Sequence, residues 1–284
     1  MTRADLPVYL DYASTTPVDP RVAECMTVCL TETGNFGNPA SETHCHGRLA
    51  RAAVEEARQQ VADAIGAEAR EIVFTSGATE ANNLALKGVA AFQRDRGRHI
   101  VTAASEHKAV LDTCDALEFS GFAVTRVAPL DDGRIDPESV RAALRDDTVL
   151  VSIMHANNET GVINDIAAIG SIARRHGARF HVDAAQTAGK LPLDVASLEV
   201  DLVSLSAHKV HGPKGIGALY VRDGTPMQKW MDGGFQEFNL RPGVENIVLF
   251  SPEPPRHLGR GRRHELSQSH RPGPGNYPGI EVTL

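Results

Sequence analysis

The chain has 284 residues and a mass of 30.5 kDa, enough for one large domain or two modest ones around a buried core. Hydrophobic residues make up 42% and charged residues 23%, a balance that argues against wholesale disorder and against a fibrous repeat. With 36 acidic and 29 basic residues the net charge is -7, which gives no general attraction to nucleic acid or to an anionic membrane.

The sequence has no obvious membrane or export signal. No apolar run reaches the roughly 18 residues that span a bilayer, and the first twelve residues lack the apolar stretch of a signal peptide. The four cysteines, Cys25, Cys29, Cys45 and Cys114, form no pattern that demands disulfides, so we expect free thiols. These features predict a cytoplasmic protein.

The predicted elements alternate between helices and short strands. A long helix is predicted over 47–66, with Gly66 as its stop. From Glu71 to Val221, β-branched runs alternate with amphipathic segments, and one of these segments ends favourably at Gly177. Strands are predicted over 71–75, 99–103, 148–154, 178–184, 201–207 and 215–221. The pattern predicts a layered α/β domain with a mainly parallel sheet.

The last 34 residues differ from the rest, which we take as one domain over 1–250. Residues 251–284 hold six of the 16 prolines, five arginines, five glycines and three histidines. Such a segment buries little apolar surface against its ordering entropy, so we predict an irregular tail. We interpret it as a truncated or frame-shifted end in place of a lost domain; a flexible binding tail is the alternative.

Three polar segments follow predicted strands at their carboxyl ends. Thr75–Glu80 turns into a helix, where free N–H groups favour an anion such as phosphate; an ordinary capped helix is the alternative. Asp183 is a carboxylate that needs a cationic partner when buried, although an Asp that caps the next helix has the same pattern. Lys209 is a candidate amine nucleophile, preferred over the loop residue Lys214; a solvated surface cation is its alternative.

Two further segments lie at the same predicted edge. His107 begins a helix, where an imidazole can stack on a flat ring and move protons near neutral pH, or can simply be exposed. Ala156–Gly161 offers amide donors, although Asn-rich turns are also common for conformational reasons. A phosphate cradle, a buried carboxylate, a ring-facing histidine and an amine nucleophile together are what pyridoxal phosphate requires.

From Tyr9 to about Val248 the chain resembles the cysteine desulfurases of the iron-sulfur cluster assembly type, a branch of the fold-type I pyridoxal-phosphate enzymes. Eight segments carry the resemblance in the family's order: LDYASTTPVDPRV, FGNPASETH, EIVFTSGATEANNLALKG, EHKAVLDTC, VSIMHANNETGVI, HVDAAQTAGKLPLDV, SAHKVHGPKGIGALYV and RPGVEN. The resemblance implies a three-layer α/β large domain, pyridoxal 5'-phosphate as cofactor, and a homodimer. It also implies a transferase that converts L-cysteine to L-alanine and passes the sulfur, as a persulfide, to an acceptor or an iron-sulfur scaffold protein.

The resemblance also implies roles for individual residues. Lys209 is the Schiff-base lysine, Asp183 contacts the pyridine nitrogen, and His107 stacks on the ring. Gln186 and Asn158 neighbour the phenolic oxygen of the cofactor. The phosphate-binding positions are Ala78, Thr79, Ser206 and His208. The isolated triplet His44, Cys45 and His46 is not interpreted as a metal site.

Two features depart from the family pattern within the matched region. Phe235 and Phe238 stand where relatives have glycine and arginine, so we expect a distorted loop. Val244 stands where many relatives have a threonine that reaches the partner subunit's phosphate, and valine cannot make that hydrogen bond.

A third departure lies beyond Ser251, where nothing resembles the family's small C-terminal domain. That domain carries the sulfur-accepting cysteine and a substrate-binding arginine, and none of the four cysteines matches the acceptor position. We therefore expect impaired desulfurase turnover, and reduced solubility because large-domain surface is uncovered. The alternatives are a catalytically inactive paralogue that binds a desulfurase or a sulfur acceptor, and a selenocysteine lyase-like enzyme.

Overall fold

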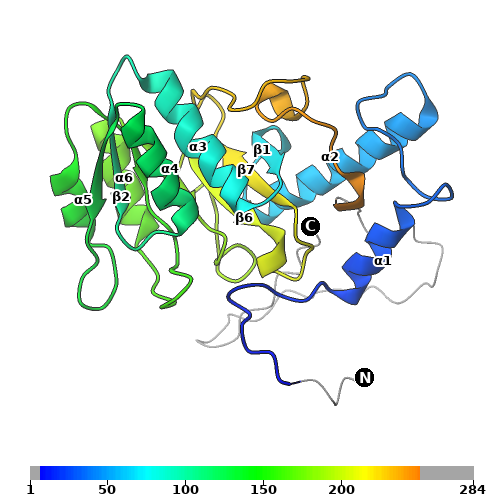
Figure 1. The fold of residues 1–284 in the computed structure, drawn as a ribbon, viewed down its shortest axis with the longest axis horizontal. Coiled ribbons are helices and arrows are strands. Elements are labelled where there is room, and N and C mark those ends of the chain that lie inside the picture. Colours follow the sequence, from blue (N-terminus) through cyan, green and yellow to red (C-terminus); the bar gives the residue numbers. More distant parts are fainter. Residues whose placement is uncertain (1–6, 250–284) are drawn as a thin grey trace, which may run out of the picture.

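One mixed sheet organises the chain in the computed structural model, which describes residues 7–249 (Figure 1). The strand order in this range is β1-β7-β6-β5-β4-β2-β3. Neighbouring strands from β6 through β3 run parallel, whereas β7 is antiparallel to both β1 and β6. The strands are β1 (Ile72–Thr75), β2 (His99–Ala103), β3 (Ala123–Val127), β4 (Thr148–Ser152), β5 (Arg179–Asp183), β6 (Leu202–Ser206) and β7 (Gly217–Val221). The prediction of a mainly parallel α/β sheet is confirmed.

Helices cover both faces of this sheet, as expected for three layers. On one face α3 (Ala78–Gln93) and α4 (Lys108–Phe119) share a core with Val73 of β1. On the other face α2 (Cys45–Ile65), α5 (Pro137–Ala143) and α6 (Ile166–His176) share a core with Ile72 and Phe74 of the same strand. Successive residues of β1 thus point into opposite cores, which is the two-residue period of a strand buried on both sides.

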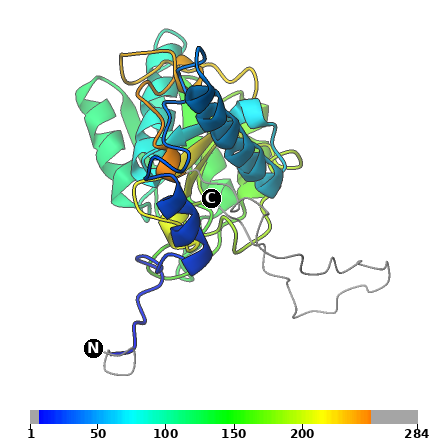
Figure 2. The same cartoon turned by 90° about the vertical axis from the view of Figure 1, so that its right-hand side faces the viewer.

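The first helix lies apart from these layers. α1 (Pro20–Val28) begins at Asp19, whose side chain accepts a hydrogen bond from the Arg21 N–H (2.8 Å). Figure 2 views the molecule from the end where α1 and α2 lie. Cys29 and Ala50 belong to a small third core at this end.

Two helix stops follow the sequence prediction closely. Gly66 ends α2 with a φ of 72°, and its N–H donates to the carbonyl of Ala62. Gly177 ends α6 with a φ of 85° and donates to the carbonyl of Ala173. Both glycines adopt the left-handed conformation, which is strained for residues with a Cβ but not for glycine. The local sequence therefore determines where these two helices end.

The described helices bear on the question of a membrane span, and the tail lies outside them. Within residues 7–249, no helix combines the length and the apolarity needed to cross a membrane. The cytoplasmic location stays a prediction, and the irregular tail predicted over 251–284 lies outside the described residues.

Candidate active site

A cavity of about 570 Å³ lies where several strands of the parallel part of the sheet have their carboxyl ends. Turns that follow β1, β2, β4, β5 and β6 supply its walls, as expected for ligand sites in open α/β sheets. The cavity collects all nine residues that the sequence singled out: Ala78, Thr79, His107, Asn158, Asp183, Gln186, Ser206, His208 and Lys209. Positions separated by up to 131 residues along the chain are thus brought to one place, while their individual roles remain predictions.

Asp183 is a buried carboxyl group in the wall of the cavity, with only 6% of its surface exposed. Burial raises the pKa of this carboxyl group, while hydrogen bonds from the Ala185 N–H (2.9 Å) and Asn82 Nδ2 (2.7 Å) oppose that change. Asn82 was not predicted as a site residue. It lies one helical turn after Thr79 on α3, and that spacing is the sequence signal that points it toward the same edge.

Lys209 ends a short 3₁₀ turn, Ala207–Lys209, directly after β6. Its Nζ donates to the carbonyl of Ala13 (2.5 Å), and Gln186 Nε2 donates to the same oxygen (2.8 Å). Burial, and then the nearby Lys190, lower the pKa of the Lys209 amine, whereas Asp183 acts against this shift. Sequence reasoning did not place the N-terminal segment at the site, because no local pattern connects Ala13 with a lysine 196 residues away.

The beginning of α3 is open toward the cavity. Its N-cap, Gly77, has a φ of 149°, and a Cβ there would meet nothing within 4 Å. Gly217 of β7 packs against Gly77: a Cβ added to Gly217 would lie only 2.7 Å from the Cα of Gly77. The first amides of a helix have no intrahelical acceptor, so Ala78 and Thr79 can donate to a bound anion.

One hydroxyl at this end has no partner within the described part of the chain. Ser206 Oγ is buried and makes no hydrogen bond among residues 7–249. The Ser76 N–H, in contrast, is already used by Glu80 Oε2 (2.7 Å). Arg241 also binds Glu80, at 2.8 Å, and these two donors hold the pKa of Glu80 low although burial alone raises it.

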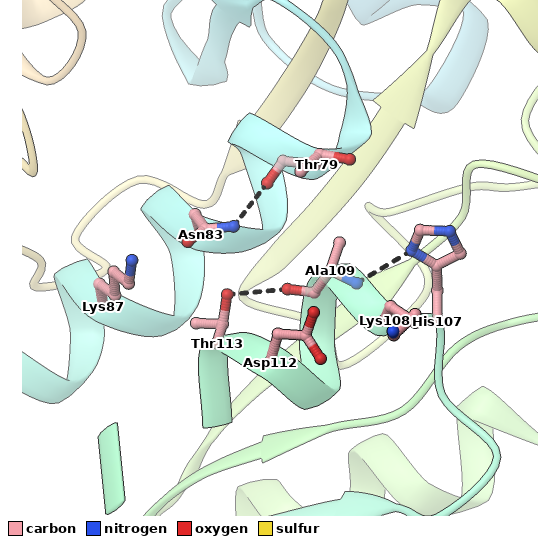
Figure 3. Close-up of a pocket in the computed structure, with 8 residues that line it drawn as sticks. All are labelled: Thr79, Asn83, Lys87, His107, Lys108, Ala109, Asp112 and Thr113. Atoms are coloured by element: carbon pink, nitrogen blue, oxygen red, sulfur yellow. Dashed lines mark hydrogen bonds between the residues drawn. The ribbon is translucent and has the colours of Figure 1, made fainter. Parts of the chain in front are cut away.

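His107 also lines a second, smaller cavity of about 350 Å³, together with residues of α3 and α4 (Figure 3). His107 Nδ1 accepts a hydrogen bond from the Ala109 N–H (3.0 Å) and thereby caps α4. Asn83 and Thr113, which line the same cavity, bond back to their own helices. Because Nδ1 is occupied as an acceptor, Nε2 is the ring atom of His107 that is left for a ligand.

Asn158 and His208 reach the cavity but also bond to neighbours. Asn158 Nδ2 donates to Glu159 Oε1 (2.8 Å). His208 Nδ1 lies 3.1 Å from Thr15 Oγ1, and burial together with the charges of Lys209 and Lys214 lowers the pKa of its imidazole.

The loop that departs from the family pattern is held by a buried ion pair. Three consecutive residues, Glu237, Phe238 and Asn239, have φ values of 46°, 57° and 63°, which is a strained conformation for residues with a Cβ. Glu237 pairs with Arg58 through two hydrogen bonds of 2.7 and 2.8 Å. Val244 on this loop is 57% exposed and is not among the residues that line the cavity.

None of the cavity-lining residues in the described range is a cysteine. No disulfide joins the four cysteines, all of which lie in the described range: Cys45 is exposed at the first position of α2, and the other three are buried. Burial raises the pKa of the Cys114 thiol to about 12, so this group is an unreactive core side chain. In the triplet His44, Cys45 and His46, the Nδ1 atom of His44 accepts a hydrogen bond from the Gly47 N–H and so caps α2.

The donor set fits pyridoxal phosphate. An amine of lowered pKa suits the aldehyde, and a buried carboxylate suits the ring nitrogen. The open helix start and the Ser206 hydroxyl, which has no partner among residues 7–249, suit the phosphate.

Comparisons with known proteins agree with this reading. Cysteine desulfurase IscS of Proteus mirabilis is 61% identical over 241 residues, which are 84% of this chain and 60% of the relative. The IscS of Pseudomonas syringae pv. tomato is 60% identical over the same shares of both chains. The chain therefore spans about 60% of the length of these curated relatives.

Solved structures show the same fold. One described as SspA in complex with cysteine is 44% identical, with a TM-score of 0.83 over 86% of this chain and 70% of that chain. A NifS-like protein is 43% identical, with a TM-score of 0.83 over 87% and 67%. The profile of the aminotransferase class-V family matches residues 8–246. The chain belongs to the class-V aminotransferase family of pyridoxal-phosphate-dependent enzymes, and its relatives within that family include cysteine desulfurases.

Proposed function

We propose that this chain binds pyridoxal phosphate through Lys209 and acts on L-cysteine as a cysteine desulfurase of iron-sulfur cluster assembly. The observation that carries the proposal is the single cavity in which the Lys209 amine, the buried Asp183 carboxylate and the open start of α3 meet. When bound, the cofactor withdraws electrons from the substrate bond that breaks.

Asp183, Lys209 and His107 have separate proposed roles around the cofactor. Asp183, held by Asn82 and the Ala185 N–H, keeps a negative charge where a protonated ring nitrogen needs one. Lys209, with its lowered pKa, holds a proton less tightly than an exposed lysine and can take and return it at Nζ. His107 keeps Nδ1 as the acceptor for the Ala109 N–H, so its neutral ring carries the proton on Nε2 and can donate a hydrogen bond from that atom to a bound ligand.

The phosphate end is built from backbone and hydroxyl donors. The amides of Ala78 and Thr79 and the Ser206 hydroxyl supply hydrogen bonds without adding a counter-charge. His208 also lines the cavity, and it can offer Nε2 to a ligand because its contact with Thr15 is made by Nδ1.

Sulfur transfer needs a thiolate close to the substrate thiol. Because no cysteine lines the described cavity, we propose that none of the four cysteines accepts the sulfur and that turnover by the chain alone is impaired. A homodimer is proposed from the resemblance to the family.

The attachment of the cofactor is the first prediction. After incubation with pyridoxal phosphate and borohydride reduction, peptide mass spectrometry should find the cofactor on Lys209, with a visible absorbance band before reduction. Lys209→Ala should lose the attachment and the band, while Lys214→Ala, a second lysine that lines the cavity, should keep attachment at Lys209. Attachment that persists elsewhere in Lys209→Ala would refute the proposed function.

The substrate is tested on the same loaded protein. L-Cysteine should change the visible spectrum, whereas D-cysteine should not, and alanine formation should stay substoichiometric without an added acceptor. Rapid catalytic alanine formation in Cys25→Ser, Cys29→Ser, Cys45→Ser and Cys114→Ser combined would contradict the proposed need for an acceptor thiol. Comparison with L-selenocysteine decides between the desulfurase and the lyase-like alternative.

A further inference from the structure

Glu106 is a buried carboxyl group beside the cavity for which the proposed reaction gives no role. It directly precedes His107 and is only 6% exposed. Its Oε1 accepts a hydrogen bond from the Met154 N–H at 2.7 Å. Its Oε2 is buried and has no partner among the residues that the structure describes.

This hydrogen bond joins two loops that follow neighbouring strands. Glu106 lies after β2, and Met154 lies after β4, which pairs with β2 in parallel. A second bond connects the same loops in the opposite direction, from Asn157 Nδ2 to the carbonyl of Ser105 (2.9 Å). The two loops place His107, Met154 and Asn158 in the wall of the cavity.

The position of Glu106 favours its neutral form. Burial raises the pKa of this carboxyl group well above its usual value, the Met154 N–H opposes the shift, and the nearby Asp183 adds to it. A neutral carboxyl group still accepts from the Met154 N–H through one oxygen, so the link between the loops does not need a charge. Glutamine has nearly the same shape and the same acceptor.

We propose that Glu106 is a positioning residue: its carboxyl group links the turn that carries His107 to the turn that carries Asn158 and so fixes both around the cofactor. The inference rests on the proposed function, because it presumes that pyridoxal phosphate occupies the cavity. Without this link, the loop after β2 or the loop after β4 could move, and the contact of His107 with the cofactor ring would loosen.

Two variants and a matched control test the proposal. Glu106→Gln keeps the acceptor for Met154 N–H, whereas Glu106→Ala removes it. Asp201→Ala is the control, because Asp201 is also 6% exposed and accepts from a backbone N–H, that of Phe180 (2.8 Å), but at the opposite end of the sheet. The measurements are the affinity for pyridoxal phosphate, the visible circular dichroism per bound cofactor and the melting temperature.

Glu106→Ala should weaken cofactor binding by about tenfold and reduce the visible circular dichroism per bound cofactor by about half. Glu106→Gln should stay within about twofold of the parent protein. Asp201→Ala should lower the melting temperature yet leave both cofactor signals within about twofold. Equal loss of the cofactor signals in Glu106→Ala and Asp201→Ala, or failure of Glu106→Gln to preserve them, would overturn the positioning role.

A third variant covers the case in which Glu106→Ala does not fold. Asn157→Asp retains Oδ1, the acceptor for the N–H groups of Glu159 and Thr160, but loses the donor to Ser105. Its visible circular dichroism per bound cofactor should also fall, and an unchanged signal would count against the linked loops. Attachment at Lys209 with unaltered signals in every variant rejects this inference alone, whereas absence of attachment in the parent protein rejects the proposed function.

Discussion

His107 uses one ring nitrogen for the fold and leaves the other free. Nδ1 accepts the Ala109 N–H at the start of α4, where a side-chain acceptor satisfies one of the helix's unpaired amides. The ring also lines the cavity. Helix capping and contact with a ligand are therefore separable by substitution at this position.

We predict that His107→Asn preserves stability but not function, because Asn is a strong N-cap and has no ring. His107→Ala should lose about 1 kcal/mol of unfolding free energy as well, since the cap is removed. Urea denaturation measures the first effect, and spectral change with L-cysteine measures the second. Equal stability of the two variants would show that the Nδ1 contact does not stabilise α4.

Residues with a local signature were predictable and residues defined by distant contacts were not. Asp183 is the last residue of the apolar strand β5, and Lys209 ends the short turn after β6, so both lie at the ligand edge of a parallel sheet. Ala13 enters the site only as a backbone carbonyl, which any residue type supplies, and its partners are Gln186 and Lys209. Nothing in the sequence indicated that Glu106, next to His107, is buried, because a carboxylate just before a helix is normally exposed.

The loop after Gly233 depends on a buried ion pair rather than on its own sequence. Glu237 accepts from Arg58 and from the Phe74 N–H (2.6 Å), and Arg58 also donates to the carbonyl of Ile72 (2.7 Å). The Arg58 guanidinium lies 4.8 Å from the ring centre of Phe74 and 5.2 Å from that of Phe238. These contacts connect α2, β1 and the loop, and they hold three residues in the left-handed region.

We predict that Glu237→Gln lowers the unfolding free energy by about 3 kcal/mol, because Arg58 would lose its buried counter-charge and keep only the half-exposed carboxylate of Glu55, at 3.3 Å. The exposed pair of Glu138 with Arg141 is the control: Glu138→Gln should cost less than about 1 kcal/mol. Denaturant unfolding of both variants makes the comparison. A cost for Glu237→Gln as small as that of the control would mean that the loop is held by other contacts.

At the scale of elements, burial decided which strands were predictable. The six predicted strands are apolar runs of the sheet interior or of its β1 edge, whereas β3 was missed. β3 is the other edge strand, mostly half-buried, and contains Thr125 and Arg126. The Arg126 side chain binds Glu118 of α4 (2.7 Å), so this strand is stabilised by a surface ion pair that hydrophobic periodicity does not reveal.

Across the whole molecule, the central sheet contains a buried polar contact that connects three strands. His181 of β5 is fully buried, with Nδ1 2.9 Å from Ser152 Oγ on β4 and Nε2 2.9 Å from Ser204 Oγ on β6. Burial lowers the pKa of His181 to about 3, so the imidazole stays neutral in the folded protein well below pH 6.5.

This histidine makes the stability of the whole domain depend on pH. In the unfolded chain its pKa is about 6.5, so between that value and about 3 the unfolded state binds a proton that the folded state does not. Protonation of His181 therefore has no effect on the unfolding free energy above pH 6.5. Below pH 6.5 it lowers the unfolding free energy by about 1.4 kcal/mol per pH unit. We predict that the unfolding free energy of the parent protein, relative to His181→Gln, drops by about 2 to 3 kcal/mol between pH 6.5 and pH 4.5.

The comparison with a variant is needed because other buried groups act in the opposite direction. The raised pKa values of Asp183 and Glu106 add stability as the pH falls, and they do so equally in the parent protein and in His181→Gln. Urea unfolding of both proteins at the two pH values measures how the unfolding free energy changes with pH. Substitution of an exposed histidine, His46→Gln, is the control and should leave the pH dependence of the parent protein unchanged. Parallel pH profiles for the parent protein and His181→Gln would mean that His181 is protonated inside the folded sheet.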